Sequence, residues 1–146
     1  MNLPAMTTSK LRAQSGLVAV EFALIASVFF MMLLGAAEFG RMLWMWNAAA
    51  EATRMGARMA VVCDLNDADI KTRMRAMVPG LTNANITLTY APAGCSATSC
   101  QTVTVSLTGY VFNSFIPVVS IQPALPPFTT TLPREYMTSA SNPACT

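Results

Sequence analysis

The fold of this chain is decided by residues 17–37, which read LVAVEFALIASVFFMMLLGAA. This stretch carries a single charge, Glu21, and contains neither proline nor asparagine. At 1.5 Å per residue it forms a helix roughly 31 Å long, which is the thickness of the hydrocarbon core of a bilayer. The stretch therefore predicts one membrane-spanning helix.

The composition limits the class of protein. Of the 146 residues, 53% are hydrophobic and 11% are charged, whereas about a quarter of an ordinary soluble domain is charged. The excess of apolar residues must lie in a membrane or in a subunit interface. The chain has no histidine, a net charge of only +2 and no basic tract, so we expect no nucleic-acid partner, no metal site and no cofactor. No catalytic motif is present, and we expect no enzyme.

The helical pattern continues to about residue 62, because no proline interrupts it. Trp44 and Trp46 lie where the aromatic belt of a membrane interface is expected. Residues 48–60 are rich in alanine and include Gly56. These small residues either let a second helix approach closely or simply favour helix formation.

The remainder of the chain predicts a small head. A shorter helix should begin at a cap formed by Asn66 or Asp67 and end at Pro79-Gly80. Apolar residues then alternate with hydroxyl residues, which predicts half-buried strands. These strands are residues 86–90, 103–107 and 128–132. The fold class is therefore α+β, with a long N-terminal helix followed by a short helix and a small antiparallel sheet.

All four cysteines follow the apolar run, which fits a compartment that permits disulfides. Cys95 and Cys100 flank the tip of the loop between the first two strands, and we expect them to pair. Cys63 and Cys145 would then pair by elimination. Two other connectivities remain open, as does the alternative of free buried thiols in the cytosol.

Residues 109–127 are irregular and contain several large apolar side chains. These side chains either close the core of the head or form a docking patch, and we favour the core. They are Phe112, Phe115, Ile116, Val118 and Val119.

The most informative stretch begins with KLRAQSG at residues 10–16, a polar and basic leader that ends at Gly16. The apolar helix follows at once, with Glu21 four residues after Leu17. A carboxylate inside a spanning helix costs about 2.5–3.5 kcal/mol on insertion scales, so its presence needs a reason.

This arrangement resembles a prepilin signal, in which a membrane peptidase cuts after glycine. Three stretches in the same order resemble the TadE-like family of minor pilins or pseudopilins of tight-adherence (Flp-type) pili. They are GLVAVEFALI at 16–25, LGAAEFGR at 34–41 and AEATRMGARMA at 50–60. The closing FTTTLPRE at 128–135 is a weaker similarity. The family often has a proline where Ser27-Val28 stand here, so we expect a less kinked helix.

The resemblance implies a processing site formed by Gly16, Leu17, Glu21 and Phe22. Cleavage after Gly16 would create a positive amine on Leu17, and Glu21, one helical turn on, would neutralise it in the same or a neighbouring subunit. The implied partners are membrane lipid, a prepilin peptidase, other pilin or pseudopilin subunits and the pilus assembly machinery. The implied function is assembly of a pilus used in adhesion and biofilm formation.

Lys10 and Arg12 place the N-terminus in the cytoplasm and the cysteines in the periplasm of a bacterial inner-membrane protein. The expected division is a leader at 1–16, a transmembrane helix at 17–38, a helical extension at 39–63 and a disulfide-bonded head at 64–146. One alternative is an uncleaved single-pass anchor that presents a periplasmic binding head. Another is a secretory signal peptide cleaved near Gly35-Ala36-Ala37, although the apolar run is long for one.

Overall fold

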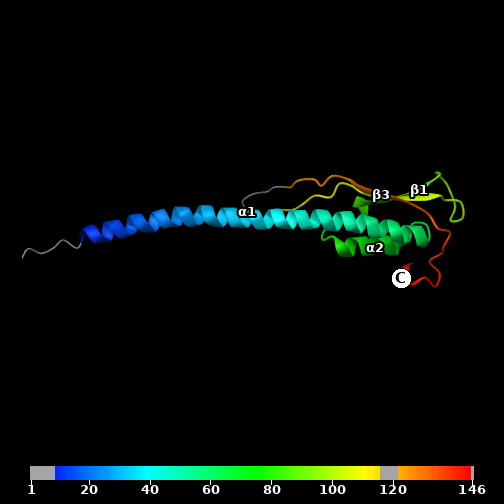
Figure 1. Cartoon of the computed structure of the whole chain (residues 1–146), viewed down its shortest axis with the longest axis horizontal. Coiled ribbons are helices and arrows are strands. Elements are labelled where there is room, and N and C mark those ends of the chain that lie inside the picture. Colours follow the sequence, from blue (N-terminus) through cyan, green and yellow to red (C-terminus); the bar gives the residue numbers. More distant parts are fainter. Residues whose placement is uncertain (1–8, 116–121, 146) are drawn as a thin grey trace, which may run out of the picture. The chain divides into compact units, whose positions relative to one another are not determined.

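The computed structural model describes residues 9–115 and 122–145, with side chains from residue 16 onward. Their contacts group the chain into two compact units, Met1–Phe39 and Gly40–Thr146, and each is described separately below. The elements of the described residues confirm the predicted α+β fold (Figure 1). They are α1 (Ser9–Val62), α2 (Ala68–Met77), the 3-10 helices η1 (Asn83–Asn85) and η2 (Pro143–Cys145), and the strands β1 (Ile86–Ala91), β2 (Thr102–Leu107) and β3 (Phe128–Pro133).

Helix α1 begins at Ser9, eight residues before the expected start at Leu17. The reason lies in the leader, because Lys, Leu, Arg, Ala and Gln, which fill residues 10–14, are all strong helix formers. Hydrophobicity marks the apolar run but not the beginning of the helix. The bond between Gly16 and Leu17 therefore lies inside α1.

Helix α2 begins at an N-cap formed by Asp67, whose Oδ1 accepts a hydrogen bond from the backbone N–H of Asp69 at 3.0 Å. Of the two candidate caps, Asp67 is thus confirmed. Asn66 instead has a φ of 58° and its backbone N–H donates to the Tyr90 hydroxyl at 3.1 Å. The helix ends at Met77, two residues before Pro79, as the sequence predicts.

The three strands form one antiparallel sheet in the order β1-β2-β3. Val103, Val105 and Leu107 of the central strand are buried on one face. The other face carries hydroxyl residues in register across the strands, and the Thr104 and Thr131 hydroxyls lie 2.9 Å apart. The predicted alternation of apolar and hydroxyl residues is therefore confirmed.

The core of the second unit contains the C-terminal half of α1. Ala49, Ala52, Ala57 and Ala60 are completely buried in it, together with side chains of α2 and of the sheet. Figure 1 shows α2 and the strands flanking this part of α1. Alanine at these positions lets the other elements approach the helix backbone closely.

Gly56 shows how close this approach is. A Cβ atom at Gly56 would collide with the Sδ atom of Met74 in α2, and Met74 is itself buried. Of the two interpretations of the alanine-rich segment, close helix approach is therefore confirmed at this position.

The irregular segment after β2 only partly follows the expectation of a core. Phe112 is buried, whereas Phe115 is 87% exposed, so the prediction is wrong for Phe115. Ile116, Val118 and Val119 lie outside the described residues. Phe112 is held because its ring stacks under the Arg41 guanidinium, 4.4 Å from Cζ to the ring centroid.

Candidate functional site

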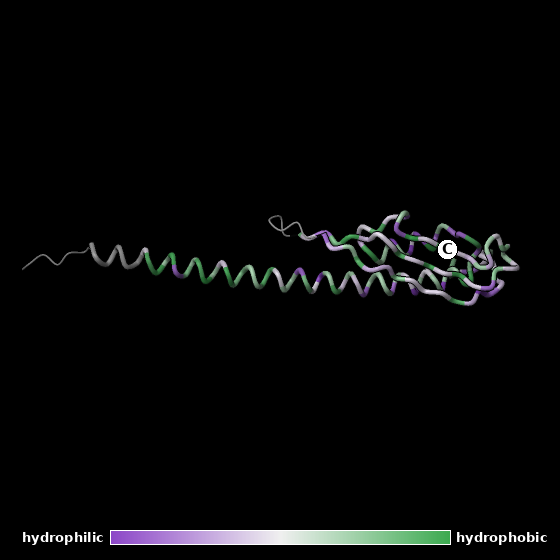
Figure 2. Tube along the Cα trace, turned by 90° about the horizontal axis from the view of Figure 1, so that it is seen from above, coloured by the Kyte–Doolittle hydropathy of each residue, from purple (hydrophilic) through white to green (hydrophobic). Residues whose placement is uncertain are grey.

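The first unit presents a continuous apolar helix surface. Between residues 16 and 39, no side chain is buried within the chain, and Leu17 and Phe22 are each 71% exposed. Figure 2 shows this part of the tube predominantly in the colour of hydrophobic residues. The helix is long and apolar enough to span a membrane. An apolar surface of this extent requires lipid or another protein to cover it.

The four predicted processing residues all lie on this surface. Gly16, Leu17, Glu21 and Phe22 belong to α1 and are exposed. Leu17 and Glu21 are four residues apart, so they lie one above the other on the same side of the helix. The helix thus brings Leu17 and Glu21 to one side, and the processing role assigned to them stays a prediction.

Ser27 is a second polar side chain in the apolar segment. Its hydroxyl donates to the Leu24 carbonyl at 2.8 Å. Because lipid offers no hydrogen-bond partner, a hydroxyl in a spanning helix is expected to be satisfied within the helix in this way. Ser27 therefore needs no partner outside its own helix.

The C-terminal end of α1 is fastened by the tail of the chain. A disulfide joins Cys63 to Cys145, and the two Cα atoms are 5.7 Å apart. The Arg134 Nη2 donates to the Cys63 carbonyl at 2.9 Å, and Asn142 donates to the Val62 carbonyl at 3.4 Å. Carbonyls at the end of a helix lack partners within the helix, and a cation is favourable there. The tail thus caps α1 as well as cross-linking it.

Ser139 extends this fastening to the start of α2. Its hydroxyl accepts from the backbone N–H of Asp64 at 2.8 Å and donates to the Asp67 Oδ2 at 2.5 Å. Ser139, Arg134 and Asn142 are not among the site residues that the sequence predicts. They lie about 70–80 residues from their partners in the sequence, and no local pattern marks such pairs.

A second disulfide joins Cys95 to Cys100 in the loop between β1 and β2, with Cα atoms 5.0 Å apart. The structure therefore has the connectivity favoured on spacing, and none of the cysteines is free. Among the described residues, no cluster of side chains is suited to hold a metal ion.

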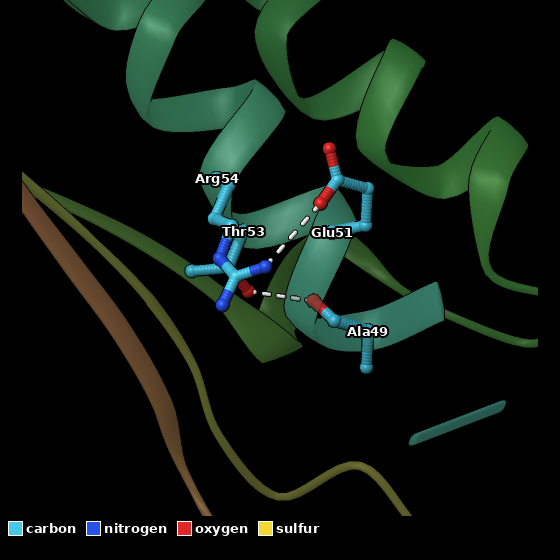
Figure 3. Close-up of polar contacts among 4 residues, drawn as sticks. All are labelled: Ala49, Glu51, Thr53 and Arg54. Atoms are coloured by element: carbon cyan, nitrogen blue, oxygen red, sulfur yellow. Dashed lines mark hydrogen bonds and ion pairs between the residues drawn. The ribbon is translucent and has the colours of Figure 1, made fainter. Parts of the chain in front are cut away.

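The two sides of α1 in the second unit differ sharply (Figure 3). Thr53 is buried and its hydroxyl donates to the Ala49 carbonyl at 2.8 Å. Glu51 and Arg54 lie on the solvent side, 3.6 Å apart between Oε2 and Nη1, with both side chains more than half exposed. An exposed pair of this kind contributes about 0–1 kcal/mol, so it adds little to the stability of the head.

Among the described residues, one helix is long and apolar enough to span a membrane, and a small α+β unit with two disulfides follows it, which fits the class of membrane-anchored proteins. Within this class, residues 16–58 match the family model of TadE-like proteins, so this segment of α1 is TadE-like, as the sequence resemblance indicates. The match suggests a protein associated with the Tad pilus, and that family is not known for enzymatic activity. No curated protein and no solved structure matches the chain.

Proposed function

We propose that this chain is a minor pilin or pseudopilin-like membrane subunit that contributes to the assembly of a tight-adherence pilus. It acts by association of its helix with other pilin or pseudopilin subunits and with the assembly machinery, not by catalysis. The observation that carries this proposal is the uncovered apolar surface of residues 16–39, which contains Glu21 and lies in the TadE-like segment.

Glu21 links this surface to assembly. Its carboxylate costs about 2.5–3.5 kcal/mol in a spanning helix, and no described side chain forms an ion pair with it. A prepilin peptidase that cuts after Gly16 supplies the missing cation on Leu17. Pairing within one chain or between neighbouring chains then offsets the cost, and pairing between chains also fixes the axial position of one helix against the next.

The proposed orientation places Lys10 and Arg12 in the cytoplasm and the head in the periplasm. Two disulfides in the head support an oxidising compartment on that side. We propose a leader at 1–16, a transmembrane helix at 17–38, an extension at 39–63 and a head at 64–146. The extension and the head share one core, so they act together as the exported part.

A second candidate is an uncleaved anchor that presents a binding head. It is favoured by one observation, because α1 passes through Gly16 and Leu17 without interruption. In that case the leader remains part of the mature helix and Glu21 lies near the cytoplasmic edge of the membrane.

The experiment is determination of the N-terminus of the membrane-extracted chain, made with and without the matching prepilin peptidase. We expect the mature chain to begin at Leu17 only when the peptidase is present. An intact leader in both samples would establish the anchor, and a start near Glu38 would establish a secreted protein.

Glu21→Gln separates processing from assembly, because it removes the charge and keeps the size of the side chain. We expect normal membrane insertion but reduced co-purification with other pilus subunits. The matched control is Ser27→Ala, which removes a polar group that the helix itself satisfies and should assemble normally. Equal assembly of both variants would contradict the role given to Glu21.

A further inference from the structure

Three large, exposed apolar side chains lie on α1 near the start of the second unit. Leu43, Trp44 and Trp46 are 44%, 56% and 41% exposed, whereas Met45 between them is buried. At 3.6 residues per turn, the three exposed positions are distributed over an arc of about 160° around the helix. They therefore cover most of the circumference that the core leaves open, and not a single stripe.

The partly exposed Glu38 and Arg41 precede these three side chains on α1, and the exposed side of the helix becomes wholly polar after Trp46. Beyond Trp46, the exposed positions of the helix are polar or charged. They are Asn47, Glu51, Arg54 and Arg58. A helix that binds a partner protein usually carries an apolar stripe along one of its sides. A boundary that crosses the helix axis is what the surface of a bilayer produces.

A loop of the second unit contacts α1 about one turn before Trp44. The Arg41 guanidinium packs on the Phe112 ring and donates to the Asn113 carbonyl, which holds the loop beside the first turn of this part of the helix. Two residues further on, Phe115 is 87% exposed. Trp44 lies three residues after Arg41 on the same side of α1, so the loop that carries Phe115 and the exposed Trp44 ring belong to the same end of the second unit.

The distance along α1 between Leu17 and Trp46 is close to the thickness of a membrane. From Leu17 to Trp46 the helix rises about 44 Å, which equals the thickness of a bilayer with both headgroup layers, about 40–45 Å. Trp46 is also held in place, because its ring packs edge-on against Phe128 with centroids 5.8 Å apart.

We propose that Leu43, Trp44, Trp46 and Phe115 form a membrane-contact belt that seats the head on the lipid surface. Its occupant is the boundary between headgroups and acyl chains, where amphipathic aromatic rings are most favourable. The belt fixes how far α1 extends from the membrane before assembly. This inference rests on the proposed membrane span, but it does not require cleavage of the leader.

The two tryptophans of the chain provide the probe. The full-length chain is placed in vesicles of phosphatidylethanolamine and phosphatidylglycerol that carry a quencher either near the headgroups or deep in the acyl chains. Trp46→Phe reports Trp44 alone. Phe115→Trp in a Trp44→Phe/Trp46→Phe background reports the loop. We expect both probes to emit at short wavelength and to lose most fluorescence to the shallow quencher, with little loss to aqueous acrylamide.

The matched control is Tyr136→Trp in the same background, because Tyr136 is also in the second unit and is 62% exposed. It should be quenched by acrylamide and not by either lipid quencher. The belt is overturned if the probes at 44 and 115 behave like this control. It is also overturned if their lipid quenching disappears as protein is added at constant lipid, because another subunit would then be the cover.

Alkaline extraction of the same vesicles distinguishes failure of the belt from failure of the proposed function. A chain that is released by the wash has no membrane span, and both proposals then fail. A chain that remains in the membrane while both probes stay in water overturns the belt alone.

Discussion

Residues 16–39 and residues 40–62 belong to one helix, yet the side chains on their surfaces differ in size, polarity and burial. In the first segment large apolar side chains are exposed on every side. In the second, alanines with no exposed surface face a core, while charged residues face water. Helical periodicity is the same in both, so it does not reveal the environment. The size of the side chains does, because small residues permit close packing and large ones on all sides require lipid or a subunit.

The largest effect on the second segment should come from its covalent link to the tail. Cys63→Ala/Cys145→Ala opens a cross-link between residues 82 apart, which contributes about 4–5 kcal/mol to the free energy of unfolding in the chain-entropy model. Denaturant unfolding of the full chain in micelles, followed by tryptophan fluorescence, measures this loss. Alkaline extraction should show that the first segment still inserts into membranes.

Its control is Cys95→Ala/Cys100→Ala, which opens a link between residues only 5 apart and should cost about 2 kcal/mol. Equal losses in the free energy of unfolding would mean that the stabilisation does not depend on the number of residues that each disulfide encloses.

The next effect concerns the buried cap at the end of the second segment. Arg134→Ala removes the donor to the Cys63 carbonyl and the packing of the guanidinium on Tyr90, 5.5 Å from Cζ to the ring centroid. We expect a loss of about 2–3 kcal/mol in the free energy of unfolding. Arg54→Ala, at a side chain 64% exposed, should cost less than about 1 kcal/mol. Similar midpoints for the two variants would show that the cap contributes little.

The same substitution in both segments sharpens the comparison most directly. Gly56→Leu pushes a side chain into Met74 and should lower the free energy of unfolding of the head by about 1–3 kcal/mol. At Gly35 an added Cβ meets no atom within 4 Å, so Gly35→Leu should leave the unfolding midpoint of the head unchanged. A head destabilised equally by both variants would mean that the two segments are not energetically separate.

The smallest effect involves Tyr110, whose hydroxyl donates to the Pro79 carbonyl at 2.6 Å. Burial raises the pKa of Tyr110 above its ordinary value of 10.0, and the positive charge of Arg41 opposes part of the rise. A raised folded-state pKa contributes stability that is present below about pH 10 and is lost as the pH rises through the folded pKa.

Tyr110→Phe should therefore cost about 1 kcal/mol near neutral pH and lose less stability than the parent chain when the pH is raised to about 11. Urea unfolding midpoints near neutral pH and at about pH 11 measure the cost of the substitution and the pH-dependent loss of stability. Parallel pH profiles for the two chains would contradict the assignment to Tyr110.

Much of this architecture follows from local pattern. The apolar run, the alternation in the strands and the Asp67 cap each act over a few residues, so the sequence predicts α1, α2 and the sheet. The start of α1 at Ser9 was missed because helix propensity, not hydrophobicity, sets it. The TadE-like segment was found because its motifs occur in one continuous stretch.

The remainder depends on contacts between distant residues. Phe112 is buried under Arg41, about 70 residues earlier, whereas Phe115 is 87% exposed, and no local pattern distinguishes the two rings. The contacts of Arg134, Ser139 and Asn142 with the end of α1 are equally distant. The processing role of Gly16, Leu17, Glu21 and Phe22 stays a prediction, because it depends on a peptidase and not on the fold.

The link between Cys63 and Cys145 has a mechanical consequence. The head leaves α1 at Cys63 and returns to it at Cys145, so the whole sheet is enclosed in a loop whose two ends coincide. Tension applied between the helix and the last residues passes through the sulfur atoms and bypasses the strands. The intact disulfide should therefore keep the head folded under such tension, and a reducing agent should transfer the same load to the hydrogen bonds of the sheet.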